Sequence, residues 1–296
     1  NCKFIDNRNS RIVHFYKWPD QPPEVTSCVF AGNDASQGFR SFHPSPNISN
    51  VIFAGNVFSA GVIDSKYGSP NFVNNTICYN HALAAATHYS SSLKIDNCII
   101  FDNTFDDYEI QTGIDSEYSI IENGFTGTGN IDADPQFAME GGMPGTWDAA
   151  PAVDEVAGRT TLTASDSGWN ADSLIGLFLN PDTSQSRLFP VVANTQTTVT
   201  ILGDVSDFAA SGDSFSFYDL HLTSLSPAID AADGDAAPAT DFEGNPRQDF
   251  EYKPDTGIGT PSYCDMGAFE LSTSTDCPAG FAWKSAPTLR GSYERA

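Results

Sequence analysis

The sequence predicts an all-β protein: a right-handed parallel β-helix, or solenoid, with a small inserted antiparallel β module. A short motif recurs about every 23 residues in the first half of the chain. Turn-favouring glycine, proline, asparagine and aspartate are spread along all 296 residues. Long apolar runs with helical spacing are scarce, whereas 21 phenylalanines make a sizeable core possible.

The recurring motif begins with asparagine or a similar residue, has phenylalanine or isoleucine at its fourth position, and closes on asparagine. Its copies are Asn1–Asn7, Ser27–Asn33, Asn50–Asn56, Asn74–Asn80 and Asn97–Asn103, with a degraded copy at Tyr118–Gly124. A period this short, without helices, is typical of one turn of a β-solenoid. We expect residues 1–138 to form about six coils, parallel because equivalent strands are one turn apart and right-handed as parallel crossovers are.

Stacking of the coils at roughly 4.8 Å should place equivalent side chains above one another. The fourth motif position is then an apolar column filling the interior: Phe4, Phe30, Phe53, Ile77, Ile100 and Ile121. The closing asparagines should occupy left-handed turn positions and form a structural ladder without a catalytic role: Asn7, Asn33, Asn56, Asn80 and Asn103.

The repeat stops after residue 138. Residues 139–219 contain short segments with partial two-residue alternation, separated by glycine, asparagine and aspartate, which predicts a small antiparallel module. Leu222–Asp230 resumes the style of the coils, so we expect residues 220–270 to return to the β-helix, followed by a tail over 271–296.

Three motifs near the C-terminus resemble the signature of a bacterial family of parallel β-helix surface proteins, choice-of-anchor Q. They are Ser226–Ala231 (SPAIDA), Asp241–Arg247 (DFEGNPR) and Asp265–Glu270 (DMGAFE), and Gly129–Phe137 matches what usually precedes them. The resemblance implies the β-helix fold and an extracellular or cell-surface location in a bacterium, but no particular activity. The inserted module departs from the family pattern, and no clear sorting sequence follows Glu270.

The charge balance excludes several partners. Asp and Glu number 38 against 14 Lys and Arg, a net charge of −24. Nucleic acid and anionic membrane surfaces both require a basic footprint, so neither is an expected partner. No window approaches the roughly 18 apolar residues of a membrane-spanning helix. Because the chain does not begin with Met, we expect a processed or truncated product.

Six cysteines are consistent with an extracellular protein. Cys2 and Cys28 hold the same motif position in adjacent coils, which predicts a disulfide between them. Cys264 and Cys277, 13 residues apart in a loop-rich region, are a second candidate pair. Cys98 is expected to pack as a small hydrophobe.

Carboxylates gather in the glycine- and alanine-rich stretch that begins at the SPAIDA motif. They are Asp230, Asp233, Asp235 and Asp241. Hard oxygen ligands on loops suit calcium, which is the one cofactor we consider. The alternative is a solvated acidic surface with turn-capping roles and no cofactor, in which Arg247 pairs with Asp241 or Asp265.

Two catalytic constellations are conceivable, because many polysaccharide lyases and hydrolases are β-helices. Cations for proton abstraction and uronate neutralisation could share one coil face: Arg40, His43, Lys66 and His88. Hydrolysis would instead need two carboxylates about 5 to 10 Å apart, with Asp64 and Asp115 as candidates. Neither set has a distinctive motif, and the net charge repels anionic glycans, so catalysis is the less favoured interpretation.

The sequence thus favours a secreted or cell-surface structural or adhesive protein. The chain begins inside a repeat, and an uncapped solenoid end invites pairing, so self-association end to end into filaments, or binding of another surface protein, is the expected partnership. The alternative is a β-helix that binds or cleaves a polysaccharide.

Overall fold

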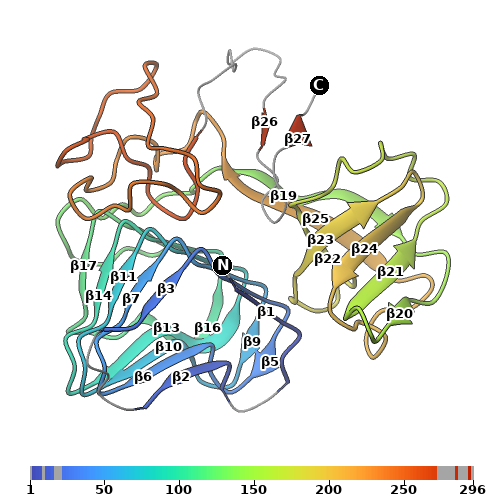
Figure 1. The fold of residues 1–296 in the computed structure, drawn as a ribbon, viewed down its shortest axis with the longest axis horizontal. Coiled ribbons are helices and arrows are strands. Elements are labelled where there is room, and N and C mark those ends of the chain that lie inside the picture. The colour runs from blue at the N-terminus through green and yellow to red at the C-terminus, as the bar shows by residue number, and fades with distance from the viewer. Residues whose placement is uncertain (1, 9–10, 17–21, 272–283, 286–292, 295–296) are drawn as a thin grey trace.

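The computed structural model describes residues 2–8, 11–16, 22–271, 284–285 and 293–294, and these residues form strands and no helix. A β-solenoid of about five turns, rather than six, lies beside a separate antiparallel sheet (Figure 1). The predicted fold class is therefore confirmed. None of the described segments is an apolar helix of the length that crosses a membrane.

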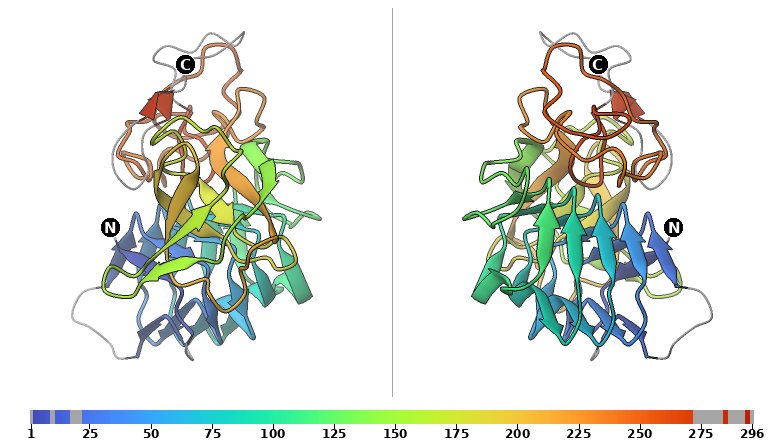
Figure 2. Two further views of the ribbon diagram at one scale, coloured as in Figure 1. Left: turned by 90° about the vertical axis from the view of Figure 1, so that its right-hand side faces the viewer. Right: turned by 90° about the vertical axis from the view of Figure 1, so that its left-hand side faces the viewer.

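Three parallel sheets form the walls of the solenoid, and Figure 2 shows their strands stacked coil upon coil. Sheet A holds the repeated motif and runs in the order β1 (Lys3–Ile5), β4 (Val29–Ala31), β8 (Ile52–Ala54), β12 (Thr76–Cys78), β15 (Ile99–Phe101) and β18 (Ile120–Ile121). Sheet B contains β2 (Val13–Phe15), β6 (Phe39–Phe42), β10 (Gly61–Lys66), β13 (His81–Tyr89), β9 (Val57–Phe58) and β5 (Asp34–Ala35), with β16 (Thr104–Ile110) also paired to β13. Sheet C contains β17 (Asp115–Glu117), β14 (Lys94–Asp96), β11 (Asn71–Val73), β7 (Asn47–Ser49) and β3 (Glu24–Thr26).

The register of sheet A builds the predicted apolar column. Phe4 lies opposite Phe30, Phe30 opposite Phe53, and the series continues through the isoleucines to Ile121. The first three rings stack with centroids 4.5 Å apart. From Phe30 onward the column is buried inside the solenoid. Burial of aromatic and branched side chains is the main stabilising contribution of each coil.

The outer face of sheet A is also buried. Strands β4, β8 and β12 have no exposed residue on either face. Ile52 and Ile99 point outward into a second apolar cluster, which includes Leu188 of the inserted module and Met266 and Phe269 near the C-terminus. Two later parts of the chain therefore cover this wall.

The inserted module is one antiparallel sheet with its own core around Trp147 and Phe217. Its strands, in sheet order, are β19 (Phe137–Thr146), β25 (Ser214–Leu222), β22 (Phe178–Asn180), β23 (Phe189–Asn194), β24 (Thr198–Leu202), β21 (Arg159–Thr163) and β20 (Ala152–Asp154). The first and last strands, β19 and β25, pair with each other, so the insertion leaves and rejoins the chain at one place.

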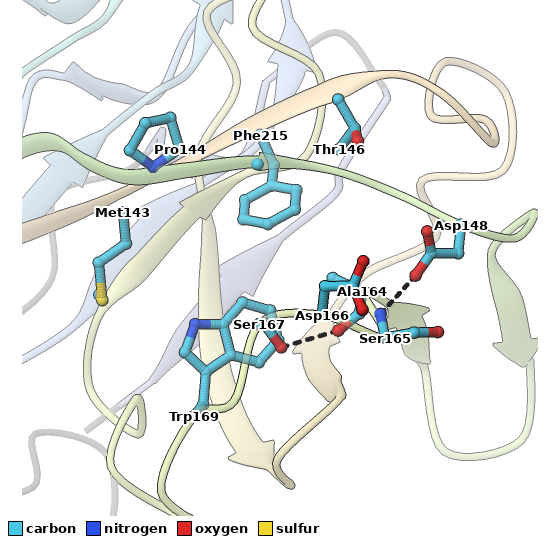
Figure 3. A pocket seen from close by; sticks show the side chains of 11 residues that line it. Met143, Pro144, Thr146, Asp148, Ala164, Ser165, Asp166, Ser167, Trp169 and Phe215 are labelled. Carbon is cyan, nitrogen blue, oxygen red and sulfur yellow. Dashed lines mark hydrogen bonds between the residues drawn. The ribbon is translucent and has the colours of Figure 1, made fainter.

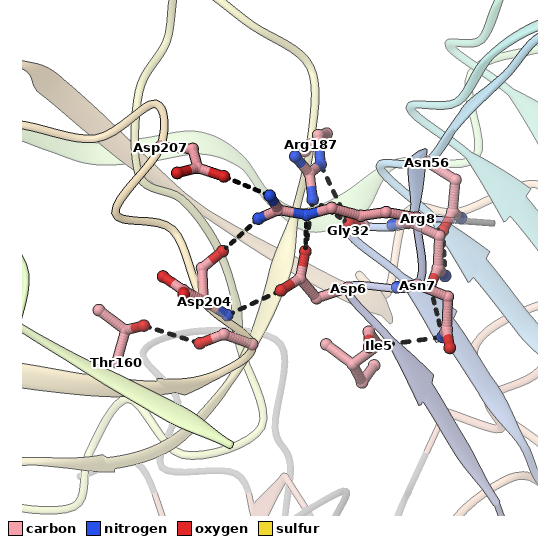
Figure 4. Close-up of polar contacts among 12 residues, drawn as sticks. Ile5, Asp6, Asn7, Arg8, Gly32, Asn56, Thr160, Arg187, Asp204 and Asp207 are labelled. Atoms are coloured by element: carbon pink, nitrogen blue, oxygen red, sulfur yellow. Dashed lines mark hydrogen bonds and ion pairs between the residues drawn. The ribbon is translucent and has the colours of Figure 1, made fainter. Parts of the chain in front are cut away.

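Arg187 joins the module to the first coils (Figure 4). Its guanidinium donates to the Gly32 carbonyl at 2.6 and 3.0 Å and pairs with the Asp6 carboxylate at 2.8 Å. Arg8 bridges outward from the same coil to the Asp207 carboxylate and to the Asp204 carbonyl at 3.0 Å. These charge-assisted contacts fix the module against the solenoid.

Two glycines permit the close approach of the module. Gly32 and Gly55 have φ values of +61° and +57°, one residue before the closing asparagine of their motifs. A Cβ atom on Gly55 would lie 2.3 Å from the Leu188 nitrogen, and one on Gly32 would lie 2.5 Å from the Phe189 ring. The left-handed backbone favours glycine, and the close contact requires it here.

The expectation that residues 220–270 return to the β-helix is wrong. After β25 ends at Leu222, residues 223–271 form no strand and add no coil. We call this stretch the covering segment, because it lies as loops along the solenoid (Figure 2). Two asparagines at the first position of the repeated motif hold the covering segment. The Asn74 amide donates to the Asp265 carbonyl at 2.8 Å, and the Asn97 amide donates to the Asp233 carbonyl at 2.9 Å. Of the expected tail 271–296, only Leu271 and the small hairpin β26 (Lys284–Ser285) and β27 (Tyr293–Glu294) are described.

Candidate functional site

The outer face of sheet B is the candidate functional surface. Alternation along β6 and β10 turns Ser41 and Ser65 inward, where both are fully buried, and turns their neighbours outward. The parallel register then stacks the outward residues into columns, with Arg40 opposite Asp64 and Phe42 opposite Lys66.

One of these columns and the adjoining turn form a strip of aromatic side chains, which we call the aromatic strip. It consists of Tyr16, Phe42, His43, Tyr67 and Tyr89. Neighbouring rings lie 4.6 to 5.5 Å apart between centroids, some stacked and some edge to face. Tyr16, Tyr67 and Tyr89 are 62%, 42% and 58% exposed, so the strip faces solvent. Exposed contiguous aromatic surface marks an interaction site.

The backbone conformation orients the rings of His43 and Tyr67. His43 and Tyr67 both adopt left-handed φ values, +81° and +59°, at the end of their strands. Their rings stack at 5.3 Å with an interplanar angle of 22°. Ser90, after β13, has a φ of +49°, so the left-handed residue is a repeated feature of this turn that orients the side chain following each strand.

A hydrogen-bonded polar column runs beside the aromatic strip. The Asp64 carboxylate accepts from the Gln37 amide at 2.7 Å and from the Thr87 hydroxyl at 3.2 Å. It also pairs with the Arg40 guanidinium at 3.3 Å. With these partners satisfied, Asp64 is built as a positioning group for Arg40 and Gln37.

The catalytic candidates do not converge. Asp115 lies on β17 of sheet C, on a different wall from Asp64, so the proposed pair of carboxylates is not brought together. Arg40 and Lys66 share the outer face of sheet B. His88 falls instead in the column of inward residues, opposite Ser65, and its ring nitrogens lie 3.1 and 3.2 Å from the backbone carbonyls of Ser91 and Thr112.

The closing asparagines stack as a ladder in the turn after sheet A. Each side-chain amide donates to the carboxamide oxygen of the next asparagine, at 2.9, 2.7, 2.7 and 2.9 Å from Asn7 to Asn103. The ladder asparagines themselves are not left-handed, contrary to expectation. The residue before each one takes that conformation: Asp6, Gly32, Gly55, Tyr79 and Asp102.

A second polar column, which sequence reasoning missed, occupies the second motif position. Backbone N–H groups donate to the side chains one coil further on, from Asn75 to Cys98 at 3.4 Å, from Cys98 to Ser119 at 3.0 Å and from Ser119 to Asn130 at 3.0 Å. Cys98 is thus a structural acceptor, and burial raises the pKa of its thiol to about 12. Cys2, Cys28, Asn75, Cys98 and Ser119 share this position, with Val51 as the exception, and that recurrence was the signal that could have revealed the column.

The predicted Cys2–Cys28 disulfide is not formed in the structure. Both residues are free thiols in adjacent coils. The Cys28 sulfur points into the coil, where it accepts from the Cys2 N–H at 3.2 Å and donates to the Thr26 carbonyl at 3.3 Å, while Cys2 is exposed. Of the second predicted pair, Cys264 is buried and Cys277 lies outside the described residues.

The four predicted calcium ligands do not form one site. Asp241 accepts from the backbone of Glu243 and Asn245 at 2.9 and 2.8 Å, as a turn-capping residue does. Asp233 similarly caps the Asp235 N–H at 3.0 Å. These bonds support the turn-capping alternative for Asp233 and Asp241.

A different set of carboxylates does come together around Asp230. One oxygen each from Asp230, Asp249 and Asp255 lies within 4.8 Å of the others. Burial, with the charges of these neighbours and Glu270, raises the pKa of Asp230 to about 7. Carboxylate oxygens at this spacing could hold a calcium ion. The loop from 249 to 255 carries no motif that could have shown this in advance.

The three C-terminal motifs meet in one buried network. Arg247 pairs with Glu270 at 2.7 Å, rather than with Asp241 or Asp265. The Asp265 carboxylate accepts from the Asp230 and Leu271 N–H groups at 2.8 and 2.7 Å. Arg247, Glu270 and Asp265 of the motifs therefore hold the covering segment together.

Sequence reasoning also missed a buried ionic group where the module meets the covering segment. His221 lies between Asp219, at 2.5 Å, and Glu243, at 3.3 Å. The two carboxylates raise the pKa of this histidine although its burial opposes the change. Asp219 and His221 are two apart on β25, which is the only sign of the pairing in the sequence.

Comparisons with known proteins give no relative for this chain: no family model, no curated protein and no solved structure matches it. The choice-of-anchor Q resemblance rests on the three C-terminal motifs, and the solenoid itself is shown by the structure.

Proposed function

We propose that this protein is a secreted or cell-surface adhesive β-solenoid, of the bacterial choice-of-anchor Q type, which binds a polysaccharide along the aromatic strip. The observation that carries the proposal is the row of exposed rings, Tyr16, Tyr67 and Tyr89, on one wall of a rigid scaffold. Aromatic rings present a flat apolar face and, in tyrosine, a polar tip.

The chemistry of the strip suits a sugar chain better than the other partners considered. The apolar face of a sugar ring can stack on an aromatic ring, while its hydroxyls need polar partners at the side. Arg40 can supply such a partner from the adjacent column, and Lys66 can supply another from the column that also holds Phe42. Stacking on aromatics also serves single-stranded nucleic acid, but that requires a positive groove, and this chain carries −24.

Adhesion is favoured over cleavage by the state of the carboxylates. Asp64, which lies in the column beside the strip, is engaged by Arg40, Gln37 and Thr87. A glycosidase needs a second carboxyl within about 10 Å, and the candidate Asp115 lies on another wall. The extracellular location rests on the family resemblance, and fractionation of producing cells would test it.

Polysaccharide binding should be tested with affinity electrophoresis and calorimetry on a panel of neutral and uronate-containing polysaccharides. We expect at least one to bind, and the double variant Tyr67→Ala/Tyr89→Ala to weaken its binding at least tenfold. Tyr252→Ala is the matched control, since Tyr252 is 65% exposed but lies on the covering segment. Failure of the whole panel to bind, or equal affinity in the double variant, would contradict the proposal.

Self-association is a second candidate, favoured by the asymmetry of the solenoid ends. At one end, Ile131 pairs with Ile120 and Asn130 caps Ser119, so the chain closes its own solenoid. At the other end, β1, β2 and β3 are the outermost described strands of their sheets. Pairing of these strands with a second copy is the outcome we test, and light scattering at high concentration would separate dimers and filaments from a monomer.

A further inference from the structure

The inserted module contains a pocket of its own, away from the solenoid walls. It has a volume of about 500 Å³ and lies between β19 and the turn at residues 164–169. Figure 3 shows Met143, Trp169 and Phe215 around the hollow, with Asp148 and Asp166 on one side of it.

The aromatic wall of the pocket is held rigidly. The Trp169 ring meets Phe215 and Phe217 edge to face, with centroids 5.9 and 5.8 Å away. Phe215 is in turn stacked on the buried Trp147 at 4.0 Å. The Trp169 backbone N–H donates to the Gln196 carbonyl at 3.1 Å, which fixes the turn that carries the ring.

Part of the pocket lining is negative. Asp148 accepts hydrogen bonds from Ser165, and these lower the pKa of its carboxyl, so it is ionised at neutral pH. Asp166 is an exposed carboxylate in the same turn. No lysine, arginine or histidine contributes to the lining, so the two carboxylates have no cation within the pocket.

The strand that forms the upper edge is irregular at this place. The register of β19 against β25 shifts between Met139 and Gly142 and again between Gly142 and Gly145. Met143, between these shifts, has a φ of +47° and is 37% exposed. Bulges re-aim side chains and are over-represented beside functional sites, and here they present Met143 and Pro144 to the pocket.

We propose that this pocket binds an organic cation, an alkylammonium or quaternary ammonium group. A cation over an indole face is attracted by the ring quadrupole, and this attraction grows as the cation loses water. Asp148 and Asp166 add direct charge complementarity, and the methyl groups of such a cation fit beside Met143 and Phe215. A neutral sugar would leave both carboxylates without a partner of opposite charge. The site is independent of the aromatic strip.

Choline chloride is the probe, and 3,3-dimethylbutan-1-ol is its uncharged isostere. Calorimetry at fixed ionic strength should show saturable 1:1 binding of choline, with the alcohol at least tenfold weaker. Asp166→Asn and Trp169→Phe should each weaken choline binding several-fold. Glu155→Gln, which removes an exposed charge elsewhere on the module, should leave it unchanged and so control for the overall charge.

Three results would overturn the proposal: no saturable binding of choline, equal binding of the alcohol, or equal losses in Asp166→Asn and Glu155→Gln. Because Asp166 is exposed, its variant should fold, and thermal melting verifies this. The Tyr67→Ala/Tyr89→Ala variant should bind choline normally, so failure of the polysaccharide proposal would leave this one standing.

Discussion

The outer faces of sheets A and B are built by the same coils, but the first is buried and the second is exposed to solvent. On sheet A the outward residues are small or branched, such as Ile52, Ala54 and Ile99, and they are buried beneath the module and the covering segment. On sheet B the outward residues are charged or aromatic, and Tyr89 is 58% exposed. The repeat therefore determines the interior of a solenoid, whereas each outer wall is free to serve either packing or binding.

The comparison predicts opposite consequences for truncation on the two walls. Ile52→Ala removes a buried side chain from sheet A and should lower the free energy of unfolding by about 2–5 kcal/mol. Tyr89→Ala on sheet B should change it by no more than about 0.5 kcal/mol. Denaturant unfolding measures both. Comparable losses would mean that the aromatic strip is a structural element rather than a binding surface.

The contact between sheet A and the module can be tested by a substitution at Gly55. Gly55→Ala should cost about 1–2 kcal/mol for the left-handed backbone, and a further 1–3 kcal/mol or so because the methyl group meets the Leu188 backbone. Gly158→Ala is the control, because Gly158 has a φ of +61° but no atom lies within 4 Å of the place its methyl group would take. The difference between the two variants, measured by denaturant unfolding, isolates the clash. Equal losses would show that the module can move away from the solenoid at little cost.

The covering segment should make stability depend on pH. The folded-state pKa of Asp230, about 7, is raised above the ordinary value near 3.9, so the protonated carboxyl favours the fold. This contribution is complete below about pH 4 and is lost as pH rises through about 7. Denaturant midpoints should therefore decline over this range more steeply in the wild type than in Asp230→Asn. Parallel profiles for the two proteins would contradict the assignment.

Calcium should reverse this pH effect if Asp230, Asp249 and Asp255 bind it. At ten times the dissociation constant the ion would stabilise the fold by about 1.4 kcal/mol, a rise of a few degrees in Tm at pH 7.5. Asp255→Asn should abolish the rise, whereas Asp166→Asn, on the module, should retain it. A Tm that calcium leaves unchanged in the wild type would exclude binding at this cluster.

The sequence was informative where spacing carries the information. Phe53 and Asn56 recur with the coil period, so their columns could be predicted one residue at a time. The aromatic strip carries a similar signal in its spacing, because Tyr16, Phe42, Tyr67 and Tyr89 are 26, 25 and 22 residues apart.

The incorrect expectations for residues 220–270 and for the calcium ligands have a different origin. Leu222–Asp230 reads like a coil, but Asp230 and its partner Asp265 are committed to backbone hydrogen bonds within loops. Asp249 and Asp255 meet Asp230 only through tertiary folding of those loops, and no local pattern encodes that meeting. Composition alone could not distinguish a further coil from a covering segment that packs on the existing coils.

Gly32 and Gly55 distinguish their two coils from the other coils of the repeat as the place where the module packs. The Arg187–Phe189 edge of the module packs where a Cβ atom on either glycine would lie, so these two glycines mark the level at which the module contacts the solenoid. An extra coil inserted after Asn103 would lengthen the solenoid and leave the contact with the module intact. The same coil inserted between Asn33 and Asn50 would separate Gly32 from Gly55 and so disrupt that contact.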